Sequence, residues 1–179
     1  MDNANSAATS FRFGDHRSFS NVLYATLKAI HLLAVVAWVG GMAFMLFCLR
    51  PAAAVLEPPA RVTLMHAAMS RFSTLVTVAA ATVFVSGAAM IGIAWSASAR
   101  ASLPFNMPLD WYVMVGLFFF MLAVFMHVRI VLFARLAKAA ASQRWAEGAA
   151  ALGAIRWEVT LNLVVGVFII VLVRLGGTA

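Results

Sequence analysis

His31 is the first residue whose chemistry needs an explanation, because it lies between Lys28 and Arg50 in a run of 21 residues without a formal charge. A helix of that length spans about 30 Å, enough to cross the hydrocarbon core of a bilayer. A titratable side chain in such a helix usually faces the protein interior and often has a function. Neutral imidazole binds copper and also serves as an axial ligand of haem iron. The alternative is a structural histidine, hydrogen-bonded to Asp110, Tyr112 or a backbone carbonyl.

Sulfur-containing side chains recur along the same run. Met42, Met45 and Cys48 follow one another at every third residue, so we expect them to share one face of the helix near its inner end. Thioether and thiolate sulfurs prefer Cu(I), which gives this spacing a chemical meaning. The segment 65–69 (MHAAM) adds two methionines and a histidine at the same membrane face. Methionine is also ordinary apolar filler, and the chain has 10 of them, so a packing role remains the alternative.

A third polar group is predicted near the inner surface. Glu158 and Asn162 are four residues apart, on one face of a helix, at the depth of His127 and Arg129. They could form a proton relay, or Glu158 could pair with an arginine, since carboxylates at this depth generally pair. Trp38 and the adjacent glycines at positions 40–41 are expected to serve helix packing. The sequence has no P-loop, dinucleotide-binding fingerprint, HExxH motif or nucleophile elbow.

The elements that position these side chains are membrane-spanning helices. The chain is 64% hydrophobic and only 11% charged, with a mean hydropathy of +0.97, far from the balance of a soluble domain. We expect an all-α fold, an integral membrane four-helix bundle over residues 22–175. Its spans are predicted at about 28–49, 72–95, 111–128 and 158–174. Any chemistry must therefore take place inside the bundle.

The remaining segments are predicted to be polar connections. Residues 1–21 read as a mobile polar arm, and residues 50–71 and 139–156 as loops. The connections between the first and second spans and between the third and fourth hold eight basic residues, against five on the opposite side. The positive-inside rule then places both termini outside. The 13 basic residues, which give a net charge of +7, mark the ends of helices in the lipid bilayer and form no continuous patch. We therefore expect no nucleic acid partner.

Depth in the membrane separates the two intramembrane histidines. His31 lies near the outer surface and His127 near the inner surface. By helical rise alone, the two histidines differ in depth by about 12 Å. We therefore expect no single metal ion to bind both. Met90 in the second span lies near His31 in depth. The single cysteine excludes an internal disulfide bond and a CxxC redox pair.

A family resemblance is carried by the segment IHLLAVVAWVGGMAFMLFCLRPA at positions 30–52. It resembles the first helix of copper resistance D (CopD) membrane domains, in which a histidine precedes an AxxxWxGG-like pattern and an Arg-Pro ending. The resemblance continues through SRFSTLVTVAAATVFVSG and RWEVTLNLVVGVFIIVLV and covers about residues 22–175. It implies a bacterial inner-membrane protein with a role in copper uptake or tolerance. His31 would be the outer ligand, with Met42, Met45 and Cys48 as inner soft ligands.

A more distant similarity leads to the HemJ-type protoporphyrinogen oxidases, which share the four-helix layout and bind haem b. His31 matches their haem histidine, and the Glu158-Val159 pair matches their fourth helix. The lysine of their third helix falls at Gly116 here, so the resemblance does not carry the oxidase reaction. Haem held by His31 alone or with Met90 is the second interpretation, and an oxidoreductase activity would follow only from it. A structural subunit of a larger membrane complex, or of a homo-oligomer, is the third.

Overall fold

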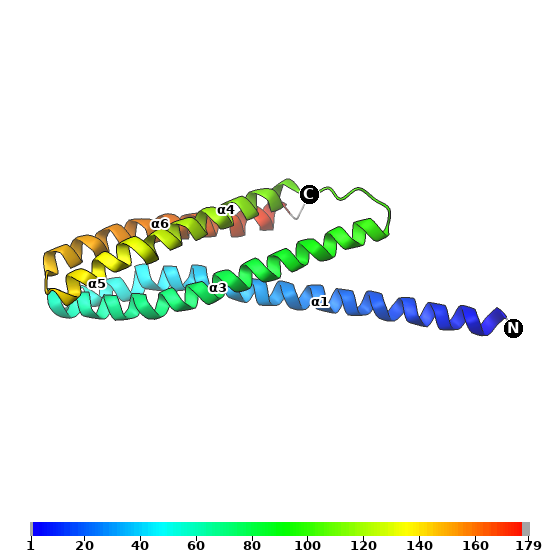
Figure 1. Ribbon diagram of the computed structural model, residues 1–179, viewed down its shortest axis with the longest axis horizontal. Helices are drawn as coiled ribbons and strands as arrows, with labels where there is room; N and C mark the ends of the chain where they lie inside the picture. The colour runs from blue at the N-terminus through cyan, green and yellow to red at the C-terminus, as the bar shows by residue number, and fades with distance from the viewer. Residues whose placement is uncertain (1, 177–179) are drawn as a thin grey trace. The chain divides into compact units, whose positions relative to one another are not determined.

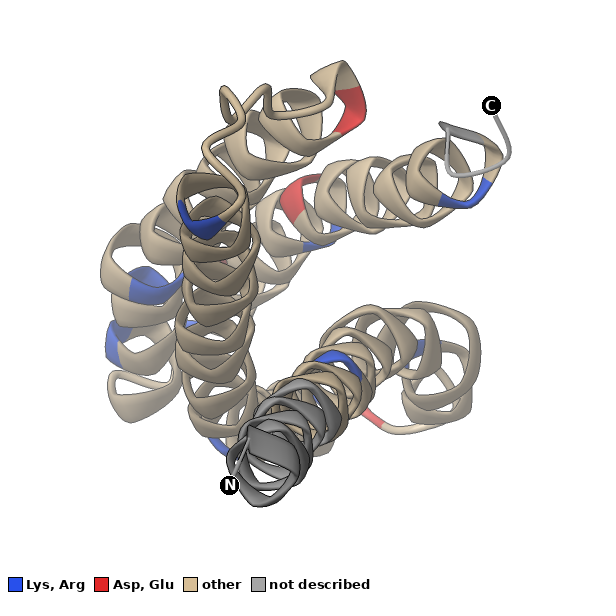
Figure 2. Cartoon of the chain, turned by 90° about the vertical axis from the view of Figure 1, so that its right-hand side faces the viewer, with Lys and Arg blue, Asp and Glu red and all other residues tan. Residues whose placement is uncertain are grey.

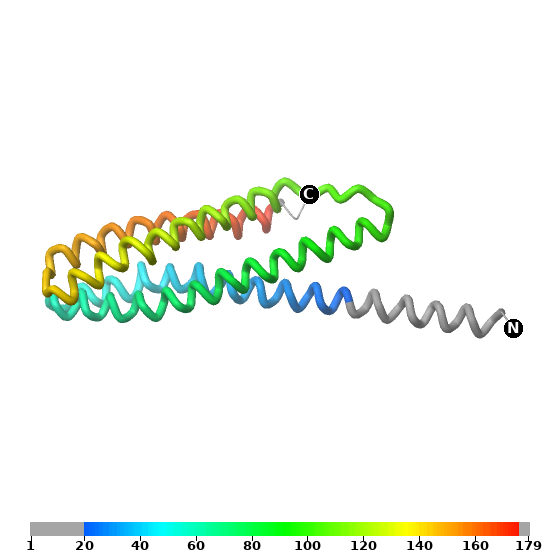
Figure 3. Tube along the Cα trace, viewed as in Figure 1, coloured from blue at the N-terminus to red at the C-terminus, as the bar shows by residue number. Residues whose placement is uncertain are grey.

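The computed structural model describes the backbone of residues 2–176 and the side chains of residues 20–175 (Figure 3). The predicted mobile arm, residues 1–21, falls outside the described side chains except for Ser20 and Asn21. The elements, in chain order, are α1 (Asp2–Phe44), η1 (Met45–Leu49), α2 (Arg50–Ala53), α3 (Pro58–Arg100), α4 (Leu109–His127), η2 (Val128–Leu132), α5 (Phe133–Ala141) and α6 (Trp145–Gly176). No strand occurs in this part of the chain.

The described residues contain four helical segments that are long and apolar enough to cross a membrane. They are Ser20–Ala53, Pro58–Arg100, Leu109–Ala141 and Trp145–Leu175. In lipid, backbone groups must be paired within the segment itself, so long apolar runs fold as helices. This confirms the predicted all-α membrane fold, and the protein is a multi-pass membrane protein. Charged side chains are sparse along the helices (Figure 2).

The helices are longer, and the connections shorter, than the sequence pattern predicts. Residues 58–71, expected to be a loop, form the first turns of α3. Proline at the first helical position has its φ already set for a helix, so Pro58 and Pro59 begin α3 instead of only ending its predecessor. The remaining connection is held by Arg61, whose Nη2 donates to the carbonyl oxygens of Ala54 and Leu56, at 2.9 Å each.

The predicted loop over residues 139–156 is also mostly helical. Helix α5 ends at Ala141 and α6 begins at Trp145, so only a three-residue turn separates them. Gln143 has a φ of 54° in this turn, a left-handed conformation that reverses the chain abruptly. The last span therefore starts at Trp145, about three and a half turns before the expected position 158.

Two π-helical turns interrupt the α-helices. In η1 the Arg50 N–H bonds to the Met45 carbonyl, and in η2 the Phe133 N–H bonds to the Val128 carbonyl. Each bond joins residues five apart, whereas an α-helix joins residues four apart. Because each turn contains one extra residue, a residue before the turn shares its helix face with residues one position later in the sequence than a continuous α-helix would give. Such turns often occur at functional sites.

The chain divides into two compact units, each described by itself. Unit 1 consists of residues 1–34 and 81–105, and unit 2 of residues 35–80 and 106–179. Within unit 2, α4 and α5 pack against α6 (Figure 1). Its hydrophobic core contains Met45, Ala53, Val62, Met65, Met69, Val128, Leu132, Leu136, Ala151 and Ile155. Figure 1 also shows the long α1 and α3 helices, each of which contributes to both units.

Aromatic and glycine contacts pack the middle of unit 2. Trp38 is only 3% exposed, and its ring meets Phe118 and Phe125 edge-on, with centroids 6.2 Å and 6.3 Å away. This confirms the predicted packing role of Trp38. The two adjacent glycines differ. A Cβ on Gly41 would lie 2.5 Å from Cε2 of Phe72, whereas one on Gly40 would meet nothing within 4 Å. Only Gly41 makes the close contact that was expected of both.

Candidate functional site

In unit 1, the imidazole of His31 turns from α1 toward α3. Its Nδ1 lies 2.9 Å from Oγ of Ser86. The Ser86 hydroxyl donates its proton to the carbonyl oxygen of Thr82, so Oγ accepts from His31 and Nδ1 carries the hydrogen. A serine on α3 is thus a partner of His31 that the sequence did not predict.

The space for the imidazole is provided by Gly87. A Cβ at this position would lie 3.3 Å from Cε1 of His31, tighter than ordinary contact. With Nδ1 bound to Ser86, the lone pair of a neutral imidazole is on Nε2, the atom through which such a ring binds a metal. The backbone of Val83, one turn before Ser86 on α3, also forms a hydrogen bond with the His31 ring. Met90 lies four residues beyond Ser86, on the same face of α3, and is half-buried. Imidazole and thioether are also a donor pair that holds haem iron.

In unit 2, two of the three predicted soft ligands point inward. Met42 and Met45 are buried, but Cys48 is exposed. The expectation that the three share one face is therefore wrong for Cys48. The reason is η1, because its wider turn begins at Met45 and carries Cys48 away from the line that an α-helix would continue.

Buried methionines from two helices line a pair of adjoining cavities. The larger cavity, of about 550 Å³, is lined in part by Met45, Met65 and Met69. The smaller one, of about 30 Å³, is lined in part by Met42 and Met69. Met69 borders both, and all four thioethers belong to side chains at most 8% exposed. The methionines of segment 65–69 thus join the first-helix pair, as the sequence predicts.

His66, the third candidate of that segment, is used differently. Its ring stacks on Phe133, with the centroids 4.9 Å apart and the planes 4° from parallel. It lines neither cavity. An aromatic stack of this kind is a packing interaction, so the structure separates His66 from the neighbouring methionines.

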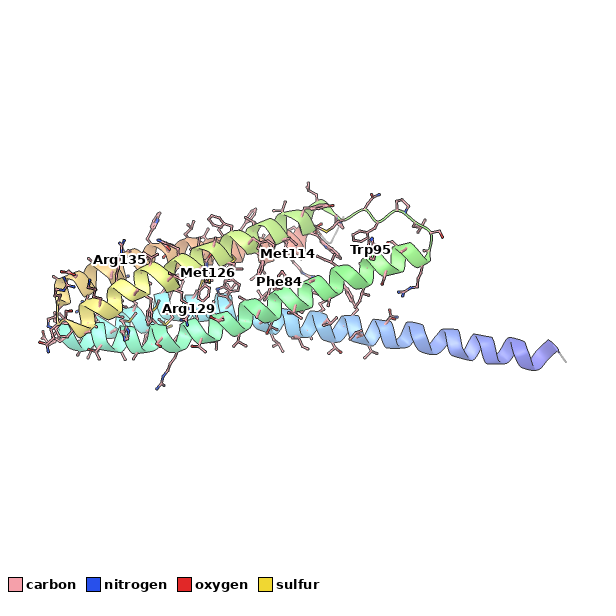
Figure 4. All side chains as sticks on the ribbon, in the orientation of Figure 1. Phe84, Trp95, Met114, Met126, Arg129 and Arg135 are labelled. Carbon is pink, nitrogen blue, oxygen red and sulfur yellow. The ribbon has the colours of Figure 1, made fainter. Side chains whose placement is uncertain are left out.

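A polar group from α6 also borders the smaller cavity. Glu158 on α6 lies within 2.7 Å of Nδ1 of His127 at the end of α4. The expected arginine partner of Glu158 is therefore wrong. Arg129 instead donates from Nη1 to the hydroxyl of the buried Ser73 (Figure 4). The π-turn η2 accounts for this, because it reorients the residues that directly follow His127.

Asn162 completes the lining of the smaller cavity. Its Nδ2 donates to the carbonyl oxygen of Met121 at 3.2 Å, while its Oδ1 is buried without a hydrogen-bond partner among the described residues. Only 3% of this residue is exposed. A buried polar atom without a partner is costly, and a cavity of this size holds one water molecule or a small ion. Oδ1 is thus an open acceptor beside the thioethers of Met42 and Met69.

Guanidinium groups lie around the larger cavity. Arg50 from α2, Arg61 from α3 and Arg156 from α6 all line it, and its lining has no acidic side chain. Arg50 and Arg156 are exposed, whereas Arg61 is half-buried and its Nε has no partner among the described residues. The sequence places these arginines only as topology signals, because nothing in their spacing shows that three helices bring them together.

The side chains that most often bind metal ions in proteins do not gather around the cavities as the methionines do. Among the described residues, no three or more His, Cys, Asp or Glu side chains gather closely enough to hold a metal ion. The groups that do converge are thioethers, one open amide oxygen and one His–Glu pair. This donor set favours a soft monovalent metal over Zn²⁺ or Mg²⁺.

Comparison with known proteins gives one result. No curated protein and no solved structure matches the chain. The family model described as copper resistance protein D matches residues 66–175, which include Met69, the His127–Glu158 pair and Asn162 but not the first span. This match covers more than half of the 179 residues. The chain therefore belongs to the copper resistance protein D (CopD) family of membrane proteins.

Proposed function

We propose that this protein handles copper as Cu(I) in the bacterial cytoplasmic membrane, with both termini on the outer side. Family membership supports a role related to copper resistance. The donor atoms support the oxidation state, because thioether sulfur binds Cu(I) in preference to harder ions. Copper is here the cargo of the protein, not a resident cofactor.

The observation that carries the proposal is the placement of four buried methionines on two adjoining cavities. A methionine in a core normally touches side chains on all sides. Met42, Met45, Met65 and Met69 instead border space, and Met69 borders both spaces. Cu(I) bound by Met42 and Met69 could exchange toward Met45 and Met65 without losing Met69. The open Oδ1 of Asn162 supplies a polar neighbour for an ion in the smaller cavity.

His31 is proposed as a separate, outer copper ligand in unit 1. Its hydrogen bond to Ser86 fixes the ring and leaves Nε2 as the ligating atom. Cys48 has no part in the proposal, because it is exposed and lines neither cavity.

The proposal is tested by anaerobic Cu(I) titration of the purified protein against a coloured Cu(I) chelator. Met69→Leu keeps the size of the side chain, removes the sulfur shared by both cavities, and should weaken Cu(I) binding about 10- to 100-fold. The matched control is Met121→Leu, since Met121 is buried but lines neither cavity. Absence of Cu(I) binding by the wild-type protein, or equal losses in the two variants, would refute the thioether site.

Haem binding is the second candidate, favoured by the oriented imidazole of His31 and by Met90 on the same face as Ser86. When bound, haem would supply electron-transfer chemistry. An absorbance spectrum of the purified protein decides between the two. A Soret band that disappears in His31→Ala would establish haem, whereas a colourless protein that binds Cu(I) stoichiometrically would leave copper. A colourless, metal-free protein that always copurifies with a partner would indicate a structural subunit.

A further inference from the structure

The larger cavity combines two chemistries that conflict if its ligand is a bare copper ion. Its lining includes three thioethers and the guanidinium groups of Arg50, Arg61 and Arg156. Thioethers attract Cu(I), but three positive charges repel a cation.

No carboxylate in the lining cancels these charges. Of the acidic residues nearest in sequence, Glu147 pairs with Arg144 at 3.0 Å and Glu158 pairs with His127. Glu57 is exposed in the connection before Pro58 and does not line the cavity. The cavity is therefore electropositive, with thioethers in its wall.

The three arginines are not equivalent. Arg61 is a structural group, since its Nη2 donates to the carbonyl oxygens of Ala54 and Leu56, although its Nε is buried without a described partner. Arg50 and Arg156 are exposed, and neither has an ion-pair partner among the described residues. These two guanidinium groups are free to bind an anion at the cavity.

We propose that the larger cavity receives Cu(I) as an anionic thiolate complex. This inference rests on the proposed function and names the form of its substrate. Arg50 and Arg156 bind the negative charge of the complex, and the thioethers of Met45 and Met65 take the metal. Each Cu–S bond to a thiolate that breaks is replaced by a Cu–S bond to a thioether, and copper remains Cu(I). The released thiolate leaves to solvent, where it takes a proton from water.

An anionic complex gives a role both to the two unpaired arginines of the lining, Arg50 and Arg156, and to its thioethers. An anionic lipid headgroup would satisfy the arginines but give no role to the sulfurs of Met45, Met65 and Met69. A bare cation would use the sulfurs but not the arginines. Only a soft metal carried inside an anion matches both sets.

The experiment compares two copper donors at one ionic strength, in detergent and without oxygen. The anionic donor is the Cu(I)–glutathione complex, and the cationic donor is tetrakis(acetonitrile)copper(I). The rate of copper transfer is measured for the wild type, for the double variant R50Q/R156Q, and for the control R71Q/R135Q. The control removes two exposed arginines that line neither cavity (Figure 4, Arg135).

The expected result is a loss of about tenfold or more in the rate from the anionic donor in R50Q/R156Q, with an equal or faster rate from the cationic donor. The difference should shrink as salt is added, because salt screens exposed charges. An unchanged rate from the anionic donor, an equal loss from both donors, or an equal loss in the control would overturn the inference.

The two proposals fail in different ways. If neither donor transfers copper to the wild type, the Cu(I) function fails and this inference fails with it. If copper binds in a Met69-dependent way but the donor's charge has no effect, only the anionic-complex inference is overturned. Native mass spectrometry in phosphatidylglycerol provides a further check, since lipid binding lost in R50Q/R156Q without a donor-charge effect would make the cavity a lipid site and overturn the inference.

Discussion

Substituting Gly41 by alanine should destabilise the protein through one contact. The added Cβ would lie 2.5 Å from Cε2, 3.3 Å from Cζ and 3.4 Å from Cδ2 of Phe72. A ring edge cannot fold away as a flexible side chain can, so the whole Phe72 ring, or helix α1, must shift. Overpacking of this kind typically costs about 1–3 kcal/mol. Because Phe72 lines both cavities, the same shift should also weaken Cu(I) binding.

The neighbouring glycine provides an internal control. A Cβ at Gly40 meets nothing within 4 Å, so Gly40→Ala should be neutral or should gain up to about 1 kcal/mol in helix propensity. The free energy of unfolding of both variants is measured by denaturant titration in detergent. Phe72→Leu in the Gly41→Ala background should restore part of the loss, because the clashing ring edge is gone. Equal stabilities of the two alanine variants would refute the reasoning.

Three further predictions follow from single contacts. Ser86→Ala removes the acceptor of His31 Nδ1–H, and ¹⁵N NMR of the imidazole should change from one fixed tautomer to a mixture; an unchanged spectrum would contradict the assigned hydrogen bond. Cys48→Ser should leave the Cu(I) affinity unchanged, because the thiol is exposed and outside both cavities, and a loss of affinity in the same chelator titration would return Cys48 to the ligand set. Gly148→Ala places a Cβ 3.1 Å and 3.2 Å from the two Cγ atoms of the buried Val62. The variant should lower the free energy of unfolding by about 1 kcal/mol, measured by the same denaturant titration. A stabilised variant would show that the packing around Val62 is loose.

The number and type of the spans were predictable because lipid permits few alternatives. An apolar run without charges must satisfy its own backbone, so composition alone predicts four helices. The helix ends were not predictable in the same way. Pro58 and Pro59 fit both the end of one helix and the start of the next, and the structure uses them as a start. The charged residues at 135–138 and 147–156 lie in helices because a helix can extend into the interface beyond the apolar core.

The candidate site was predicted in its residue types but not in its pairings. His31 stands out because a titratable side chain is unusual within an apolar helix, and Met42 and Met45 stand out because they recur with Cys48 at every third residue. Their partners come from distant parts of the chain, and periodicity carries no information across such distances. Ser86 is 55 residues from His31, and nothing in its local sequence distinguishes it from the other small residues of its helix. The pairing of Glu158 with histidine instead of arginine depends in the same way on tertiary packing.

The orientation of Cys48 was missed for a different reason. A spacing of three residues predicts a shared face only where the hydrogen-bond ladder stays α-helical. Sequence patterns for π-turns are weak, so η1 could not be foreseen from MLFCL. The same applies to η2, which follows His127 and contains Arg129, the residue whose side chain reaches Ser73.

The turn η1 also sets the angular phase between Met45, in the cavity wall, and Arg50, at its exposed side. Each residue rotates an α-helix by about 100°, so the residue hydrogen-bonded to the Met45 carbonyl would normally be the fourth one after it, whereas in η1 the fifth, Arg50, takes that place. Removing one residue between the two would restore a continuous α-helix and leave the guanidinium group on nearly the same side of the helix as before. The first span can therefore lose one residue within this turn and still keep Arg50 at the cavity, whereas a deletion in its α-helical part would rotate the two halves of the span by about 100° relative to each other.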